Sequence, residues 1–354
     1  HWSRFLLMLT GLCAMTLMTG YRARLFTLLC WVLLISIQVR NPLVLDGGDD
    51  YLRLLLFWSL FLPAEQQKQM SVPGSCLLLQ VVSIYFFCAL LKLNIPEWRQ
   101  GGEALWLSLR SQYSGNLGLQ GWLSTYPHLL GKLVRPIVFF ELTLPLLLLA
   151  PCVRRRLVAV ALWFSFHGFV LLAVNLPFFS LVAMTALIPF LPSVFWDKLF
   201  RLPSEVAFAC SPARSVVYAG LSVLFFAYIS WWNVAGLKKD APWFHSWAVI
   251  AEVAQIHQRW RMFTSVSPEY RWDVVEGQLA DGGRVNLLFR RAGLDINEPR
   301  SYAERYPNRR WWYFLHEITS FSSDVFRLEY ENYLCREWNS REATKLVSLH
   351  WQQL

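Results

Sequence analysis

Residues 75–92 read SCLLLQVVSIYFFCALLK, an apolar stretch that is long enough to cross a bilayer and ends on Lys92. The stretch runs into LNIPEWRQGG (residues 93–102), a segment with tryptophan, proline and glycine. An ionisable group at the inner end of a membrane helix is costly unless the site uses or neutralises it. We therefore predict a membrane-spanning helix here, and Lys92 is the first place to look for chemistry.

The rest of the chain has the composition of a membrane protein. Of its 354 residues, 55% are hydrophobic and 16% are charged, and its mean hydropathy is positive. Soluble globular proteins rarely combine these values. The sequence starts at His1 rather than Met and enters an apolar run within a few residues, so we expect a truncated chain with an earlier helix missing.

Eight apolar runs predict the fold class, a polytopic all-α bundle of about eight transmembrane helices. The runs are residues 5–19, 25–39, 51–63, 73–92, 133–150, 157–173, 178–191 and 215–232. Several are shorter than the roughly 20 residues of a straight crossing, so re-entrant segments remain an alternative. The basic loops YRAR (21–24) and VRRR (153–156) lie an even number of spans apart, which places both in the cytoplasm. The same alternation places the chain after Trp232 outside.

The chain becomes polar after residue 233, so we divide it into a transmembrane bundle at 1–239 and a small extracytoplasmic domain at 240–354. Within that domain VVEGQLADGGRVNLLFRR (274–291) predicts a β-hairpin around a DGG turn. The tryptophan-rich residues 243–263 predict an amphipathic helix on the membrane surface.

Several function classes have no support in the sequence. The net charge of +9 belongs mostly to the membrane half and its topology, and no basic patch is interleaved with aromatics, so we predict no nucleic-acid partner. The seven cysteines form no CxxC pair and no HExxH is present, so we predict no metal.

Three ionisable side chains inside the predicted spans are candidates for catalysis. Lys92 is either a buried base, whose neutral amine takes a proton, or a lysine that anchors a helix end at the interface. His167 either contacts a substrate oxygen or makes an interhelical hydrogen bond. Glu141 pairs with Lys92 or His167, or with a backbone donor freed by the kink at Pro145. For a buried base, we expect Lys92→Ala to leave folding nearly intact, because it removes a desolvated cation.

A mixed-charge cluster begins the third predicted span. It consists of Arg40, Asp46, Asp49, Asp50 and Arg53 around a GG turn. These residues either gate a headgroup or peptide substrate, or form an ion-pair knot that fixes the loop onto the bundle.

Four segments carry a resemblance to a known family. They are RNPLVLDGGDDYLRLLLFWSLFLP (40–63), YFFCALLKLNIPEWRQGGEALW (85–106), QRWRMF (258–263) and NRRWWYFL (308–315). With them the chain resembles the horizontally transferred transmembrane domain family, the bacterial relatives of vitamin K-dependent gamma-carboxylase.

The resemblance implies a role for individual residues. In the carboxylase a membrane-embedded lysine deprotonates reduced vitamin K, and Tyr85, Lys92, Trp98 and Gly101 match that lysine and its surroundings in kind. The spacing from lysine to tryptophan is one residue longer here. A histidine that the carboxylase uses after the preceding helix has no counterpart in FLPAEQQ (61–67), which argues against glutamate carboxylation as the reaction.

We therefore expect an enzyme of the bacterial inner membrane that acts on a lipid-soluble quinol, with a reduced, vitamin K-like quinone as cofactor. The expected catalytic residues are Lys92, His167 and Glu141, and the expected substrate-binding residues are Tyr85, Trp98, Gly101 and Arg40. Expected partners are membrane lipids, the quinol and a secreted protein substrate. The alternative is a non-catalytic factor for maturation or export of secreted proteins, similar to lipase maturation factors, and a transporter comes third.

The predicted topology can be tested with an Asp281→Cys variant. Both basic loops fall on the cytoplasmic side when the spans are counted, which places residue 281 outside. We therefore expect a membrane-impermeant maleimide to label this cysteine on cells whose inner membrane is intact. An Arg154→Cys variant should label only after permeabilisation, and the unsubstituted chain gives the background. Labelling of residue 281 only in broken cells would refute the assigned orientation.

Overall fold

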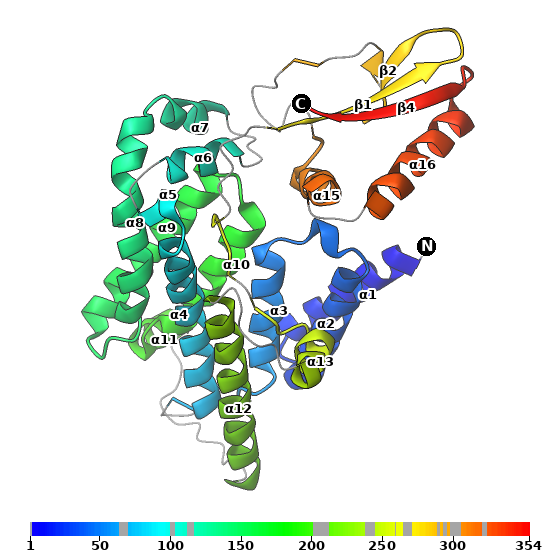
Figure 1. The fold of residues 1–354 in the computed structure, drawn as a ribbon. Helices are drawn as coiled ribbons and strands as arrows, with labels where there is room; N and C mark the ends of the chain where they lie inside the picture. Colours follow the sequence, from blue (N-terminus) through cyan, green and yellow to red (C-terminus); the bar gives the residue numbers. More distant parts are fainter. Residues whose placement is uncertain are drawn as a thin grey trace. The chain divides into compact units, whose positions relative to one another are not determined.

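The computed structural model describes residues 2–63, 70–99, 103–111, 117–200, 212–237, 245–258, 260–264, 271–288, 291–292, 296–297, 306–320 and 324–354. The chain divides into two compact units (Figure 1). The first consists of His1–Trp106, Tyr126–Leu172 and Leu176–Val266, and the second of Leu107–Thr125, Ala173–Asn175 and Ser267–Leu354. The first unit thus extends beyond the predicted boundary at 239/240.

The chain is mainly helical. The helices are α1 (Trp2–Met18), α2 (Ala23–Val39), η1 (Pro42–Val44), α3 (Gly47–Ser59), α4 (Val72–Leu93), α5 (Pro96–Arg99), α6 (Ala104–Ser111), α7 (Leu117–Ser124), α8 (Pro127–Leu147), α9 (Val153–Ala173), α10 (Pro177–Leu187), η2 (Ile188–Phe190), α11 (Ser193–Phe200), α12 (Pro212–Leu237), α13 (His245–Ala254), α15 (Arg309–Ser320) and α16 (Asp324–Arg341). The strands are β1 (Asp273–Leu279), β2 (Arg284–Asn286), β3 (Arg291–Ala292) and β4 (Leu346–Gln353).

Each of the eight apolar runs contains or overlaps a helix, namely α1, α2, α3, α4, α8, α9, α10 and α12. Among the described residues, Val72–Leu93, Val153–Ala173 and Val216–Leu237 are long and apolar enough to cross a membrane. The others are shorter or carry more charge, so the composition and length of the helices support three crossings and a membrane protein. The count of eight stays a prediction.

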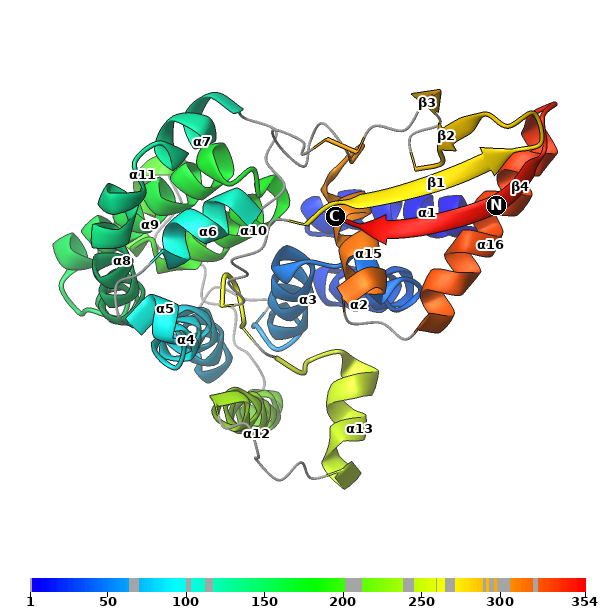
Figure 2. The same ribbon diagram turned by 45° about the horizontal axis from the view of Figure 1, so that its top comes forward.

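Helix α4 is central in the first unit. It begins where the Ser71 hydroxyl accepts a hydrogen bond from the Gly74 amide at 3.1 Å, and Pro73 occupies a first-turn position that needs no amide hydrogen. Its apolar surface packs against α8, α12 and α3, and Figure 2 looks nearly along α4 and α12. Burial on several sides explains why so apolar a helix carries buried polar groups such as Gln80 and Lys92.

Helix α3 begins at the predicted mixed-charge cluster, where one ion pair of the predicted knot forms and two of the carboxylates cap the helix. Asp46 caps the helix by accepting from the Gly48 amide at 2.7 Å, while Asp49 accepts from the Asp46 amide at 2.8 Å. Arg53 pairs with Asp50. Gly48 allows a close approach, since a Cβ there would lie 2.9 Å from the Phe179 backbone of α10.

The second unit contains a small antiparallel sheet in the order β3-β2-β1-β4. The predicted hairpin is confirmed: β1 and β2 are joined at the DGG turn, where Gly282 adopts φ +86°. Helix α16 covers one face of the sheet (Figure 2), and its Leu334 packs with Val275, Val285 and Leu346.

The predicted interfacial helix at 243–263 is wrong in its extent. Helix α13 ends at Ala254, and Trp247 is exposed on it, as an interfacial residue would be. Ile256 and Trp260 are buried in the first unit instead. The helix ends because Gln255 takes a left-handed conformation, φ 50°, and the Ile256 amide closes the last turn on the Ala251 carbonyl.

The sheet provides a stability test at Gly277. A Cβ there would lie 2.5 Å from Leu346 Cδ1 and 3.0 Å from Leu287 Cγ. We expect Gly277→Ala to cost about 1–3 kcal/mol through overpacking, and to speed hydrogen exchange of the β1 and β4 amides in the full-length protein. Gly121→Ala is the control, because a Cβ there meets nothing within 4 Å. Equal exchange in the two variants would contradict the packing argument.

Candidate functional site

The candidate site lies in the first unit on one face of α4. Tyr85, Cys88 and Lys92 are three and four residues apart, a spacing that aligns side chains on the same side of a helix. All three are buried. Their partners come from α8, α9 and residues 262–263, so segments distant in sequence meet along this face.

Lys92 forms a buried ion pair with Glu141 of α8. Its Nζ lies 2.6 Å from both carboxylate oxygens, and the two residues are 1% and 6% exposed. An interfacial anchor would place its ammonium among the lipid headgroups, whereas this ammonium points into the protein. Of the partners predicted for Glu141, the structure selects Lys92.

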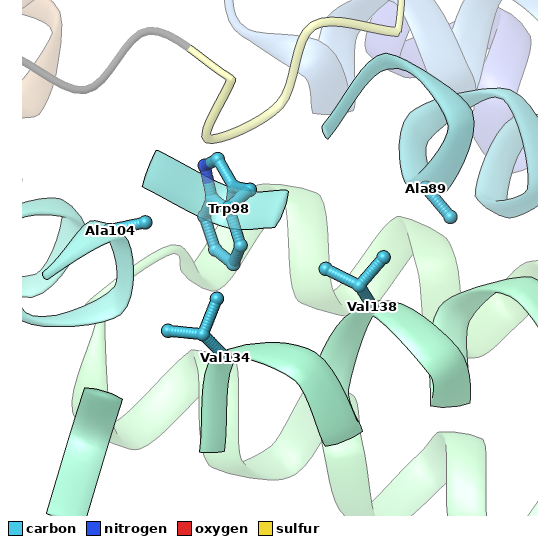
Figure 3. Packing of buried hydrophobic residues seen from close by; sticks show 5 residues of the cluster. All are labelled: Ala89, Trp98, Ala104, Val134 and Val138. Atoms are coloured by element: carbon cyan, nitrogen blue, oxygen red, sulfur yellow. The ribbon is translucent and has the colours of Figure 1, made fainter. Parts of the chain in front are cut away.

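Aromatic rings cover the pair. The centroid of the Trp98 ring lies 4.8 Å from Lys92 Nζ, and that of Phe263 lies 5.9 Å from it, distances at which a cation is attracted to a ring face. Figure 3 shows Trp98 over Val134 of α8, and these residues form a buried cluster with Val138, Ala89 and Ala104. The pair is therefore screened from water and its mutual attraction is strong.

A second polar contact lies about two turns before Lys92 on α4. The Tyr85 hydroxyl and His167 Nε2 of α9 are 2.8 Å apart, and Trp163 packs on both rings. The tyrosine ring centroid is 4.0 Å from that of Trp163. This is the interhelical hydrogen bond predicted as one role of His167. Its Nδ1 is buried without a hydrogen-bond partner among the described residues, so a polar atom is free to bind a further group.

The remaining predicted site residues divide into three cases. Trp98 lies at the pair, as described. Arg40 is exposed and its guanidinium donates to the Ser3 hydroxyl of α1, so it joins neither the site nor the α3 knot. Gly101 lies outside the described residues. The structure therefore brings together Lys92, Glu141, Trp98, Tyr85 and His167.

Sequence reasoning missed the residues that approach the site from the segment after α13. The Cys88 thiol donates to the Met262 carbonyl at 3.6 Å, and the Trp98 indole donates to the Phe263 carbonyl at 2.8 Å. The sequence did carry a signal that a further segment enters the bundle. Gln80 and Asn233 are polar residues in apolar helices, and such residues need hydrogen-bond partners when they are buried. Both bind Gln258 of this segment.

No family model, curated protein or solved structure matches the chain. The family resemblance described above therefore stays a prediction, and functional interpretation depends on the geometry of the site.

The ion pair corrects the expected result of Lys92→Ala. Removal of the lysine alone leaves the Glu141 carboxylate buried and uncompensated, so folding is not expected to stay intact. We expect Lys92→Ala, and likewise Lys92→Met or Glu141→Leu alone, to lower the free energy of unfolding by about 3–5 kcal/mol. The double variant Lys92→Met/Glu141→Leu, which removes both charges and keeps volume, should recover most of the loss.

Lys92→Met, Glu141→Leu and their combination form a double-mutant cycle that can be measured by denaturant unfolding in detergent. Lys132→Ala on α8 is the control, because that lysine is exposed. Additive effects of the two single substitutions would show that the residues do not interact.

Proposed function

We propose that the protein is an integral membrane enzyme that removes a proton from a lipid-soluble hydroxyl substrate such as a quinol. The observation that carries this proposal is the bidentate contact between Lys92 Nζ and Glu141, at 2.6 Å, among apolar helices. A buried ionisable pair in a membrane bundle is expensive and commonly marks a substrate or proton pathway. Lys92 is the proposed base, and Glu141 accepts a proton from it so that the amine becomes neutral.

In the proposed reaction the first step is a proton transfer within the pair. When an apolar substrate occupies the site, Lys92 Nζ passes a proton to Glu141, because a neutral pair is better tolerated than two charges where water is excluded. The free amine takes the hydroxyl proton of the substrate. The ammonium so formed balances the anion that this leaves, and Trp98 also faces the ammonium.

The second polar contact suits the other end of such a substrate. A reduced, vitamin K-like quinone has two oxygens on one ring and supplies the acidic hydroxyl. We assign Tyr85 and His167 to the distal oxygen, and the unpartnered Nδ1 of His167 supports this assignment. Tyr85 lies on α4, the helix that also carries Lys92, and His167 lies on α9, so α4 would contact the substrate at both ends.

Length and composition support three membrane spans, and the proposed arrangement contains more. We propose that all eight apolar helices insert in a bacterial inner membrane and that the second unit lies outside, where a secreted protein could meet it. Lipids and a quinol reach the bundle from the bilayer. Membership of the horizontally transferred transmembrane domain family would explain these features together.

A non-catalytic role is the second candidate, and the enclosure of the pair favours it. Lys92 is 1% exposed, and its ammonium is used fully by Glu141 and two rings. In a membrane factor that assists secreted proteins, such a pair would have a purely structural role, which is to fix α4 on α8.

Substitution by arginine separates the two roles. A guanidinium can pair with Glu141 but cannot lose its proton, so Lys92→Arg should lower quinol turnover at least about a hundredfold while the protein still inserts. Glu141→Gln should also be inactive. Turnover is measured on purified protein in lipid nanodiscs, with a reduced vitamin K-type quinone and chromatography of the products in air. Lys132→Arg on exposed α8 surface is the matched control, and full activity of Lys92→Arg would favour the structural role.

A further inference from the structure

Residues 255–258 and 260–264, which we call the strap, enter the helical bundle after α13. They are not helical, yet Ile256, Gln258 and Trp260 are each less than 5% exposed. A buried segment without regular structure needs partners for its backbone and side-chain polar groups. The helices of the first unit supply them.

Buried polar side chains on three helices bind the first half of the strap. Arg53 Nε of α3 donates to the Gln255 carbonyl at 2.8 Å. The Gln258 side-chain oxygen accepts from Gln80 of α4 at 3.0 Å and from Asn233 of α12 at 3.4 Å. The Trp260 indole donates to the same oxygen at 2.8 Å. Gln258 is therefore the hub of this network.

The second half of the strap lies on the candidate site. Cys88 and Trp98 donate to the successive carbonyls of Met262 and Phe263. The Phe263 ring is 5.9 Å from Lys92 Nζ. In Figure 3 the indole nitrogen of Trp98 points toward the yellow trace of this segment. The strap is thus the part of the enclosure that belongs to no helix.

Both ends of the strap have an unfavourable backbone conformation. Gln255 and Phe263 have φ values of 50° and 58°, in the left-handed region that favours glycine. Gln255 is at the position after α13 that is most often glycine. Phe263 lies inside a tight turn closed by the Thr264 amide on the Arg261 carbonyl. Rotation at these two residues would relieve strain while the helices that bind the strap stay in place.

We propose that the strap is a gate over the Lys92–Glu141 pair, with Gln255 and Phe263 as its hinges and Gln258 as its latch. The structure shows the closed state. Opening breaks the hydrogen bonds of the strap and uncovers Cys88 together with Lys92, without unfolding of α4 or α8. The gate itself does not depend on the proposed function, which only gives the reason for it: a substrate must reach a pair that is otherwise enclosed.

Cys88 is a natural reporter, because its thiol contacts the strap. The full-length protein in nanodiscs is treated with N-ethylmaleimide, and modification of individual cysteines is followed by mass spectrometry. Cys76 is the internal control: it is buried on the same helix, twelve residues or roughly 18 Å before Cys88. We compare the native chain with Gln258→Leu, which removes the latch, and Gln255→Gly, which favours the closed hinge.

The gate requires opposite responses from the two variants. Gln258→Leu should speed Cys88 modification by roughly tenfold and Gln255→Gly should slow it severalfold, with Cys76 unchanged in both. If Cys88 is inert in every variant, or Cys76 follows it, there is no local gate. Because this readout does not involve turnover, an inactive protein with these labelling rates would refute the proposed function and leave the gate standing.

Discussion

The ion pair between Lys92 and Glu141 is the constraint on which the first unit depends. Two charges buried among apolar helices lose much hydration free energy, and only close bidentate contact compensates for that loss. The contact fixes the rotation of α4 relative to α8 and so determines which residues of α4 face inward. Tyr85 and Cys88 reach their partners because they share that face.

The same principle explains the other buried polar residues of the first unit. Arg53, Gln80 and Asn233 all lie where a helix is covered by protein, and all bind the strap. In an apolar environment, the free-energy cost of leaving a polar group unpaired exceeds the net contribution of a hydrogen bond. These contacts therefore specify one path for the strap through the bundle, which hydrophobic packing alone would not.

The candidate site and the strap combine rigidity and mobility in one place. The lysine, its carboxylate and the Tyr85–His167 contact are carried by long helices, which suits groups that need a fixed geometry. The cover consists of irregular backbone with a left-handed residue at each end. Segments of this kind have lower local stability than packed helices, so a movable cover can coexist with a fixed pair.

The sequence by itself located the helices of the eight apolar runs and the hairpin. Apolar runs located the helical segments, and the DGG turn located the antiparallel strands, because both signals are local in the chain. It also indicated Lys92, Glu141, His167 and Tyr85 as residues with a chemical reason to be buried. Only the tertiary structure decided that Lys92 pairs with Glu141, that Arg40 lies elsewhere, and that residues 255–258 and 260–264 enter the bundle instead of continuing a helix. These choices depend on which side chains meet across 37 to 202 positions of sequence, and periodicity within one segment carries no information about such partners.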